Sequence, residues 1–314
     1  MIIERLSHAA FSVKRVHPQQ ALEGERATTE RLYSKKEGFM NRLHAVSSRS
    51  VSPCPAPSPS QNGCEQEKVG LSISRIDILA FQTTFDVKKK RGLVPVNVSF
   101  FPKEQFARSL KIMIPVFAKN LAVSSRVAVA QSGESLGNIV VPEGKTGLAT
   151  ICSLIVNGVL LKHGIPIDSK FGGILQMRQG QGLRFVELIH YDSSSLDPSE
   201  IFIRGKMTSI GQVAAGGNGK ILANFREIPA LSRSLVEGVI DDFTSAGING
   251  VLAFGGIGHP VCQTHVDINK SGMILIGGLN PVAAACEAGI HVDNNAMSTV
   301  MEFEHLRDIQ SVEH

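Results

Sequence analysis

The chain has 314 residues, of which 43% are hydrophobic and 19% are charged. Its length and apolar content are sufficient to bury the core of one large or two ordinary domains. Residues 1–68 carry 10 basic and 7 acidic residues, and residues 69–314 carry 22 and 21. This near balance excludes a broad phosphate-binding surface on the second and larger part of the chain.

Cysteine and hydropathy patterns narrow the class of protein further. The five cysteines are an odd number without a CxxC pair, and the ten histidines are scattered. The sequence therefore predicts neither a disulfide framework nor a structural zinc site. No apolar run reaches the roughly 18 residues of a membrane-spanning helix, and the acidic residues near the N-terminus are untypical of a transit peptide. We expect a cytoplasmic protein that does not contact the membrane.

Residues 1–67 are expected to be poorly ordered. A thin apolar stripe over Arg26–Ala45 is compatible with a short helix, but Ser47–Ser60 reads SSRSVSPCPAPSPS. Proline fixes φ and lacks an N–H group, so the four prolines within seven residues exclude a helix or a central strand. The segment predicts a Pro/Ser-rich linker with no recognisable helix-turn-helix.

From residue 68 on, apolar residues recur alternately at strand and helix spacings. In chain order, the first part predicts a short strand at Val69–Ile73, a helix at Ser74–Thr84, a strand at Leu93–Phe101, a helix at Lys103–Lys119, strands at Arg126–Ala130 and Gly147–Cys152, and a helix at Val156–His163. The second part predicts strands at Phe171–Gln176 and Arg184–His190, a helix at Pro198–Met207 with Asp197 as N-cap, a strand at Lys220–Phe225, a helix at Ala230–Ala246, strands at Gly250–Phe254 and Gly272–Ile276, and a helix at Asn280–Ala288. The last ten residues are expected to be frayed.

The same unit occurs twice in the chain. Asn97 and Pro102 recur 127 positions later as Asn224 and Pro229, and Gly147 recurs 125 positions later within a similar string. Because Gly, Asn and Pro each fix a backbone feature, their recurrence in order outweighs the low overall identity. We expect an α/β or α+β fold, an internally duplicated αβ unit with pseudo-two-fold symmetry whose mixed sheets are covered by helices. The two repeats should span about residues 68–176 and 185–301.

Two equivalent junctions between a strand and a helix are the first candidates for a binding site. Cys152-Ser153 and Gly277-Gly278 each follow a buried apolar strand and precede a helix. The exposed N–H groups of a helix start favour an anion, and glycine lets a ligand approach the backbone. Two such starts facing one axis would suit a dicarboxylate in a cleft between the repeats. Equally, small residues at these positions could serve only close packing of strand and helix.

Further candidate ligand contacts are Asn157, Lys170 and Asn280. A loop lysine can neutralise a carboxylate but is more often solvated, and Asn280 followed by proline also fits a simple helix start. For Arg226-Glu227 an ion pair or a ligand clamp is possible, and we favour the ion pair. Since no phosphate loop, dinucleotide motif or acid–base set is recognisable, no catalytic residue, cofactor or metal ligand is predicted.

Several strings resemble the regulatory domain of the archaeal nitrogen repressor family, NrpR. They include Ile73–Asp86, Val141–Gly147, Asn157–Pro166, Ser195–Ile203, Lys206–Thr208, Gly219–Ala230 and Gly277–Ala284, and together they extend over about residues 68–305. The resemblance implies a dimeric repressor of nitrogen-assimilation genes whose DNA binding is relieved by 2-oxoglutarate. That effector is a five-carbon dicarboxylate, in agreement with the two helix starts.

The N-terminal segment departs from the family pattern, in which a winged helix-turn-helix precedes the regulatory domain. The chain is therefore expected to bind DNA directly only if residues 1–67 fold. Otherwise it is expected to act through a DNA-binding family member or the transcription machinery. Two other functions remain open from the sequence. One is a small-molecule enzyme that uses the same cleft, and the other is a dimerisation or partner-docking module without ligand sensing.

Overall fold

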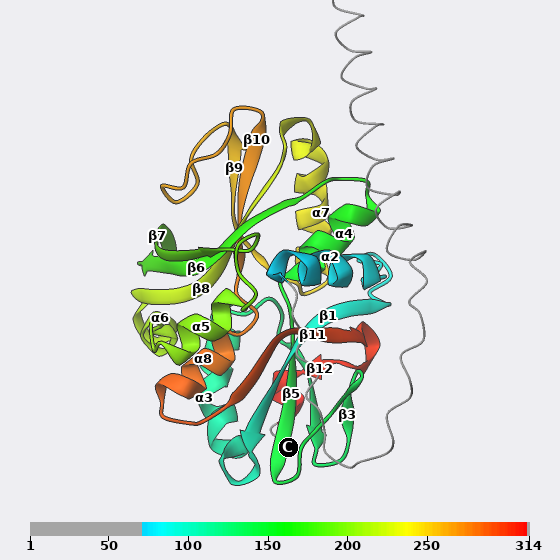
Figure 1. The fold of residues 1–314 in the computed structure, drawn as a ribbon, viewed down its shortest axis with the longest axis vertical. Coiled ribbons are helices and arrows are strands. Elements are labelled where there is room, and N and C mark those ends of the chain that lie inside the picture. The colour runs from blue at the N-terminus through cyan, green and yellow to red at the C-terminus, as the bar shows by residue number, and fades with distance from the viewer. Residues whose placement is uncertain (1–70, 313–314) are drawn as a thin grey trace, which may run out of the picture. The chain divides into compact units, whose positions relative to one another are not determined.

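A computed structural model describes residues 71–312 of the chain, drawn as a ribbon in Figure 1. The predictions for residues 1–67, namely the linker and the lack of a helix-turn-helix, lie outside the described residues. Among the described helices, none has the length and apolar character to cross a membrane.

The described strands form two five-stranded sheets and one small hairpin. In spatial order the first sheet consists of β11 (Asp293–Glu302), β1 (Leu93–Pro102), β5 (Lys145–Ile151), β2 (Arg126–Gln131) and β12 (Arg307–Asp308). The second consists of β7 (Gln181–His190), β6 (Asp168–Arg178), β8 (Gly219–Pro229), β10 (Lys270–Ile276) and β9 (Val251–Ile257). The hairpin joins β3 (Ser135–Leu136) to β4 (Ile139–Val140). The strand pairs are antiparallel, so the α+β form of the expected fold is confirmed but the sheets are not mixed in direction.

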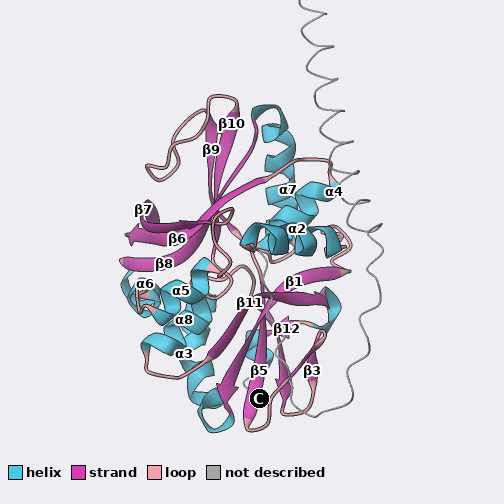
Figure 2. Ribbon diagram, viewed as in Figure 1, coloured by secondary structure: helices cyan, strands magenta, loops and turns pink. Residues whose placement is uncertain are grey.

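Seven α-helices in the described part pack against these sheets and one another (Figure 2). They are α2 (Ser72–Gln82), α3 (Phe106–Ala118), α4 (Leu154–Lys162), α5 (Pro198–Arg204), α6 (Ile210–Gly216), α7 (Arg233–Ser245) and α8 (Asn280–Glu287). The helix α2 packs on α4, and α6 packs on α8. Each of the two helices that follow the candidate junctions is thus covered by a helix from elsewhere in the chain.

The order β–α–β–β–α–β occurs twice along the chain. The first repeat runs from β1 through α3, β2, β5 and α4 to β6, and the second runs from β8 through α7, β9, β10 and α8 to β11. The last strand of each repeat pairs in the sheet of the other: β11 pairs with β1, and β6 pairs with β8. Neither repeat therefore completes a sheet by itself.

Two equivalent ion pairs reflect the same symmetry. Lys145 lies 3.2 Å from Asp293, and Lys270 lies 3.6 Å from Asp168. Each pair joins a lysine of one repeat to an aspartate of the other, and lysines and aspartates are both 125 positions apart in the sequence. The predicted duplication and its pseudo-two-fold relation are therefore reproduced down to individual side chains.

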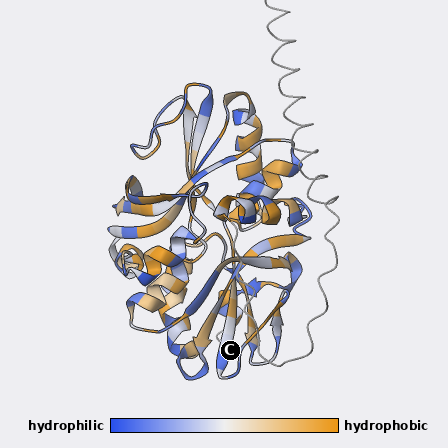
Figure 3. Cartoon of the chain, in the orientation of Figure 1, coloured by the Kyte–Doolittle hydropathy of each residue, from blue (hydrophilic) through white to orange (hydrophobic). Residues whose placement is uncertain are grey.

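The apolar core is also shared between the repeats. One cluster combines Phe101 and Met113 of the first repeat with Phe225 and Ile274 of the second. Residues of high hydropathy occur along the strands and helices of both halves (Figure 3). Complete burial of such a side chain stabilises the fold by roughly 1.5–3 kcal/mol, so the two repeats stabilise each other.

Three local predictions were wrong or incomplete. No strand covers residues 71–73, because α2 begins at Ser72, whose N–H donates to Ser194 O. The last residues are not frayed up to residue 312, because β12 pairs with β2 and Ile309 is buried. The strand β11 was missed, because DNNAMSTVME has no regular alternation of apolar residues and pairs instead with the strongly apolar β1.

Candidate functional site

The two strand–helix junctions meet where the repeats pack together. A Cβ atom built on Gly278 would lie 3.3 Å from Cys152 Cα and 2.7 Å from Ile151 O. The hydroxyl of Thr150 donates to Gly278 O over 3.1 Å. The expected meeting of Cys152-Ser153 with Gly277-Gly278 is therefore confirmed, and their role in ligand binding stays a prediction.

Beside these junctions lies a small cavity of about 20 Å³. Its polar wall comes from both halves of the described part, and the segment between β6 and β8 contributes to it: Asn97, Ser153, Tyr191, Asp197, Ser199, Asn224 and Arg226. A volume of this size holds about one water molecule. A five-carbon ligand would therefore need the walls to move apart.

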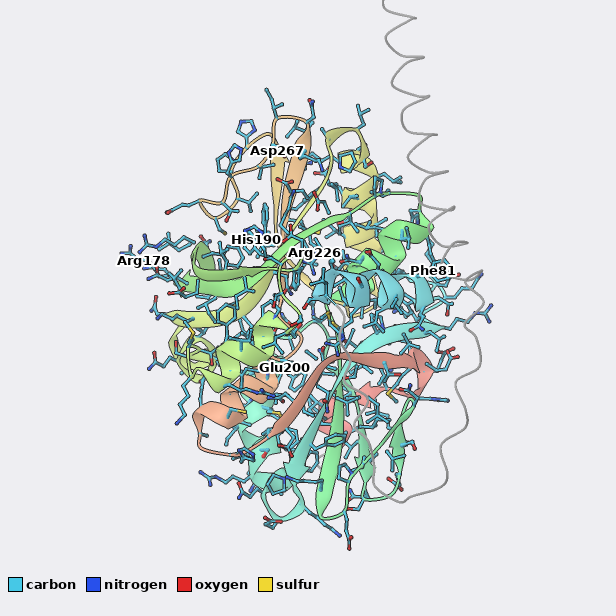
Figure 4. The ribbon with its side chains drawn as sticks, viewed as in Figure 1. Phe81, Arg178, His190, Glu200, Arg226 and Asp267 are labelled. Carbon is cyan, nitrogen blue, oxygen red and sulfur yellow. The ribbon has the colours of Figure 1, made fainter. Side chains whose placement is uncertain are left out.

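Arg226 supplies a positive charge to this cavity. The side chain is only 1% exposed and lies at the centre of the described residues (Figure 4). Its Nε donates to Asn157 Oδ1 over 3.4 Å, an NH group donates to Phe225 O over 3.2 Å, and its Cζ lies 4.9 Å from the centre of the Tyr191 ring. Among the described residues, no carboxylate lies within 4.0 Å of the guanidinium. A buried charge without a counter-ion is costly, so this wall of the cavity favours an anion.

The expected ion pair between Arg226 and Glu227 is wrong. Successive residues of a strand point to opposite faces of the sheet, and Glu227 lies 3.3 Å from Lys170 instead. Lys170 also lies 2.7 Å from Asp168, whose carboxylate raises the pKa of the lysine. The alternative of a ligand clamp at Arg226 is the one that agrees with the geometry.

Two asparagines at equivalent positions of the repeats flank the cavity. Asn224 accepts a hydrogen bond from Tyr191 and donates to Ser153 Oγ over 3.0 Å. Its counterpart Asn97 accepts from Met297 N, but its Nδ2 is buried without a partner. That amide group would lie 2.5 Å from a Cβ atom on Gly278, so an unsatisfied donor is held beside the second junction.

Asp197 is the acidic residue of the cavity wall. It is the N-cap of α5, as predicted, and its Oδ1 accepts from Ser199 N over 2.8 Å and from Glu200 N over 3.4 Å. Burial raises the pKa of this carboxyl. Burial also raises the pKa values of Cys152 and Tyr191 to about 12 each. Both are therefore neutral near physiological pH, which disfavours Cys152 as a nucleophile.

The other predicted site residues have different roles. Asn157 accepts a hydrogen bond from Arg226 and donates to Ser169 Oγ over 2.9 Å. It therefore fixes the position of Arg226 without lining the cavity itself. Lys170 and Asn280 do not line the cavity: the first is engaged by carboxylates, and the second bonds to the backbone of Leu222. At Gly277 a Cβ atom would lie 2.6 Å from Leu222 Cβ, so this glycine serves close packing.

Sequence reasoning missed Asn97, Tyr191 and Asn224 as residues of the site and misassigned Arg226. A signal was present for Asn97, Asn224 and Arg226. Asn97 and Asn224 are the asparagines that recur in the two repeats, and Arg226 lies two positions after Asn224. Since residues i and i+2 of a strand share a face, the sequence predicts that the side chains of Arg226 and Asn224 point to the same side of the sheet.

Comparisons with known proteins agree with this architecture. Residues 69–308 match the family described as NrpR regulatory domains NRD1 and 2. The chain belongs to the NrpR regulatory-domain family. A curated relative from Methanosarcina mazei, named global nitrogen regulator NrpRI, is 32% identical over 286 residues, which cover 91% of this chain and 88% of the relative.

Two further NrpR relatives are longer than this chain. The global nitrogen regulators NrpR of Methanocaldococcus jannaschii and Methanococcus maripaludis are 25% and 31% identical, over 78% and 71% of this chain but only 41% and 37% of their own lengths. A crystal structure of a nitrogen repressor-like protein from Methanococcus jannaschii has a TM-score of 0.66 at 26% identity, and the match covers 77% of this chain and all of that one. The NrpR fold is thus shared with a solved relative over most of the described residues.

Proposed function

We propose that this NrpR-family chain is a regulator of nitrogen-assimilation genes that senses 2-oxoglutarate in the cavity between its repeats. The observation that carries the proposal is the buried guanidinium of Arg226, which lines the cavity and has no described carboxylate within 4.0 Å. The names of its relatives as nitrogen regulators support the class of genes.

Each end of the ligand has a complementary group in the cavity wall. One carboxylate would pair with Arg226, because a guanidinium binds carboxylates through two parallel hydrogen bonds. The other would accept from the unpaired Nδ2 of Asn97, near the start of α8. The starts of α4 and α8 add the favourable field of a helix N-terminus. In this proposal the site binds its ligand without turnover.

The small volume of the cavity links binding to a change of shape. Because about 20 Å³ cannot hold five carbons and two carboxylates, the ligand would bind better to a form in which the repeats have moved apart. A ligand shifts a conformational equilibrium by its difference in affinity for the two forms. We therefore propose that the ligand separates the two junctions and that this change of shape alters DNA binding.

The test replaces Arg226 and compares it with a matched arginine. Arg233 also lies 4.9 Å above an aromatic ring, that of Phe254, but belongs to α7 and does not line the cavity. We expect Arg226→Gln to weaken 2-oxoglutarate binding at least tenfold, about 1.4 kcal/mol, and Arg233→Gln to leave it unchanged. Isothermal titration calorimetry measures both constants.

Arg226→Gln should still fold, because it removes a buried charge rather than a satisfied ion pair. Its melting temperature without ligand is therefore expected to stay close to that of the unchanged chain. Equal 2-oxoglutarate affinity of Arg226→Gln and the unchanged chain would disprove the site. Consumption of 2-oxoglutarate, followed by NMR, would favour an enzyme instead.

We further propose that the chain acts as a homodimer through its duplicated domain. It would reach DNA through its own N-terminal segment, if that segment folds, or through a DNA-binding family member or the transcription machinery. Closed two-fold assembly is the commonest form of soluble oligomers. Light scattering should give a mass of twice 33.7 kDa at micromolar concentration. A mass of one chain at that concentration would refute the dimer and leave the cavity proposal untouched.

A further inference from the structure

Asp197 brings a second ionisable group to the cavity that holds Arg226. The carboxyl is 6% exposed and lines the cavity at the start of α5. Both backbone N–H groups that it caps donate to Oδ1. The second oxygen, Oδ2, takes part in neither of these hydrogen bonds. The cavity therefore has one basic and one acidic wall residue.

We propose that Asp197 makes effector binding proton-linked: the dianionic ligand binds together with one proton, which is taken up from solvent by the Asp197 carboxylate. The inference rests on the proposed function, since it concerns the same site and the same ligand. No other reactant is needed, and no bond other than the O–H bond of the carboxyl is formed.

The charges in the cavity require this uptake. A ligand with two carboxylates brings two negative charges, and Arg226 provides one positive charge. An ionised Asp197 would add a third negative charge inside a small cavity with buried walls, where like charges repel strongly. Once protonated, the same carboxyl becomes a hydrogen-bond donor to a ligand oxygen, so the proton turns a repulsion into a contact.

The groups around Asp197 leave it as the one that titrates with the ligand. Burial has the largest effect on its pKa and raises it, while hydrogen bonds from Ser199 and Glu200 and the charge of Arg75 of α2 lower it. Cys152 and Tyr191 stay protonated, as their pKa values of about 12 indicate. The residues of β11 that line the cavity, Ala296 and Met297, carry no charge.

Glu200 is the nearest competitor for the proton and provides the control. Burial raises its pKa as well, but its carboxylate accepts from Ala296 N over 2.7 Å and does not line the cavity. Figure 4 shows this side chain beside β11, away from Arg226. The charge of Asp197 also raises the pKa of Glu200, so neutralising Asp197 removes this effect, and Glu200 takes up no proton with the ligand.

The sign of the pH dependence follows from linkage. Asp197 is protonated at a higher pH in the complex than in the free protein, so affinity rises as the pH falls. Between the free and the bound pKa values of Asp197, the dissociation constant should increase about tenfold for each unit of pH. Above and below that window the dissociation constant becomes independent of the titration of Asp197.

The test is calorimetric titration of 2-oxoglutarate into the full chain between about pH 6 and 8, in buffers of different ionisation enthalpy. We expect uptake of close to one proton per ligand. Asp197→Asn keeps an N-cap of equal quality but removes the charge. It should abolish the proton uptake and bind at least tenfold more tightly at the upper end of the range. Glu200→Gln should keep the uptake.

The possible outcomes separate this inference from the proposed function. Tight binding of 2-oxoglutarate without proton uptake, or weaker binding by Asp197→Asn, would overturn the role of Asp197 and leave the site standing. Absence of binding by both the unchanged chain and Asp197→Asn would overturn the proposed function together with the inference. Binding by Asp197→Asn alone would support the inference, since the ionised carboxylate then blocks the site.

Discussion

Asn97 combines two conditions that rarely occur together. It is 2% exposed, and its Nδ2 is one of three buried side-chain nitrogen or oxygen atoms in the described residues that lack a hydrogen-bond partner. The other two do not line the cavity: Glu227 Oε2 lies in the ion pair with Lys170, and Ser271 Oγ lies elsewhere. An unpaired buried donor costs about 1–3 kcal/mol. Asn97 therefore places an unpaired donor beside the same cavity that Arg226 lines with a positive charge.

Gly278 is a position at which a single methyl group should matter. Its Cβ would lie 2.5 Å from Asn97 Nδ2 and 2.7 Å from the backbone oxygen of Ile151, which cannot rotate away. We expect Gly278→Ala to lower the free energy of unfolding by about 1–3 kcal/mol, as measured by urea denaturation. The matched control is Gly238→Ala in α7, where nothing lies within 4 Å.

At Gly238 the added methyl group meets open space within a helix, so stability should rise by about 0.4–1 kcal/mol. If the two alanine variants had the same stability, the close approach of the two junctions at Gly278 would be wrong. A loss at Gly278 alone identifies this glycine as a requirement of the contact between the repeats.

At the scale of elements, prediction succeeded where the pattern is local. The helix α7 lies inside the predicted Ala230–Ala246, and β10 includes the predicted Gly272–Ile276, because amphipathic and apolar runs mark them. The strand β11 depends on its partner β1, and β12 depends on the edge of β2. Such pairings join residues 180 to 209 positions apart, so no short window of sequence contains both partners.

The candidate site was predictable in the same partial way. Small residues between a buried strand and a helix marked the two junctions, and both do meet. The role of Arg226 was predicted wrongly, because Glu227 follows it directly and neighbouring residues of opposite charge suggest an ion pair. Alternation along β8 separates them. Tyr191 and Asp197 lie between β6 and β8. The sequence indicated Asp197 only as the N-cap of a helix and contained no signal for Tyr191.

At the scale of the described part as a whole, the exchange of β6 and β11 is the feature with the widest consequence. Each sheet contains a strand from the other repeat, and both repeats contribute residues to the cavity. A change of spacing between the repeats therefore changes the cavity, and a ligand in the cavity changes the spacing. The exchanged strands limit this movement, because the repeats can separate only as far as the pairings of β11 with β1 and of β6 with β8 allow.

The exchange predicts that neither half of the chain folds alone. A fragment of residues 1–192 lacks β11 beside β1 and leaves β6 without β8, and a fragment of residues 193–314 has the converse defect. Their exposed strand edges and the shared apolar cluster should prevent cooperative folding. We expect each fragment to show no cooperative thermal transition by circular dichroism.

An equimolar mixture, refolded together, should regain a single transition, because the missing pairings form between fragments. A cooperative transition in either fragment by itself would show that one repeat is self-sufficient. The two repeats would then be independent domains, and the strand exchange would only tether them to each other.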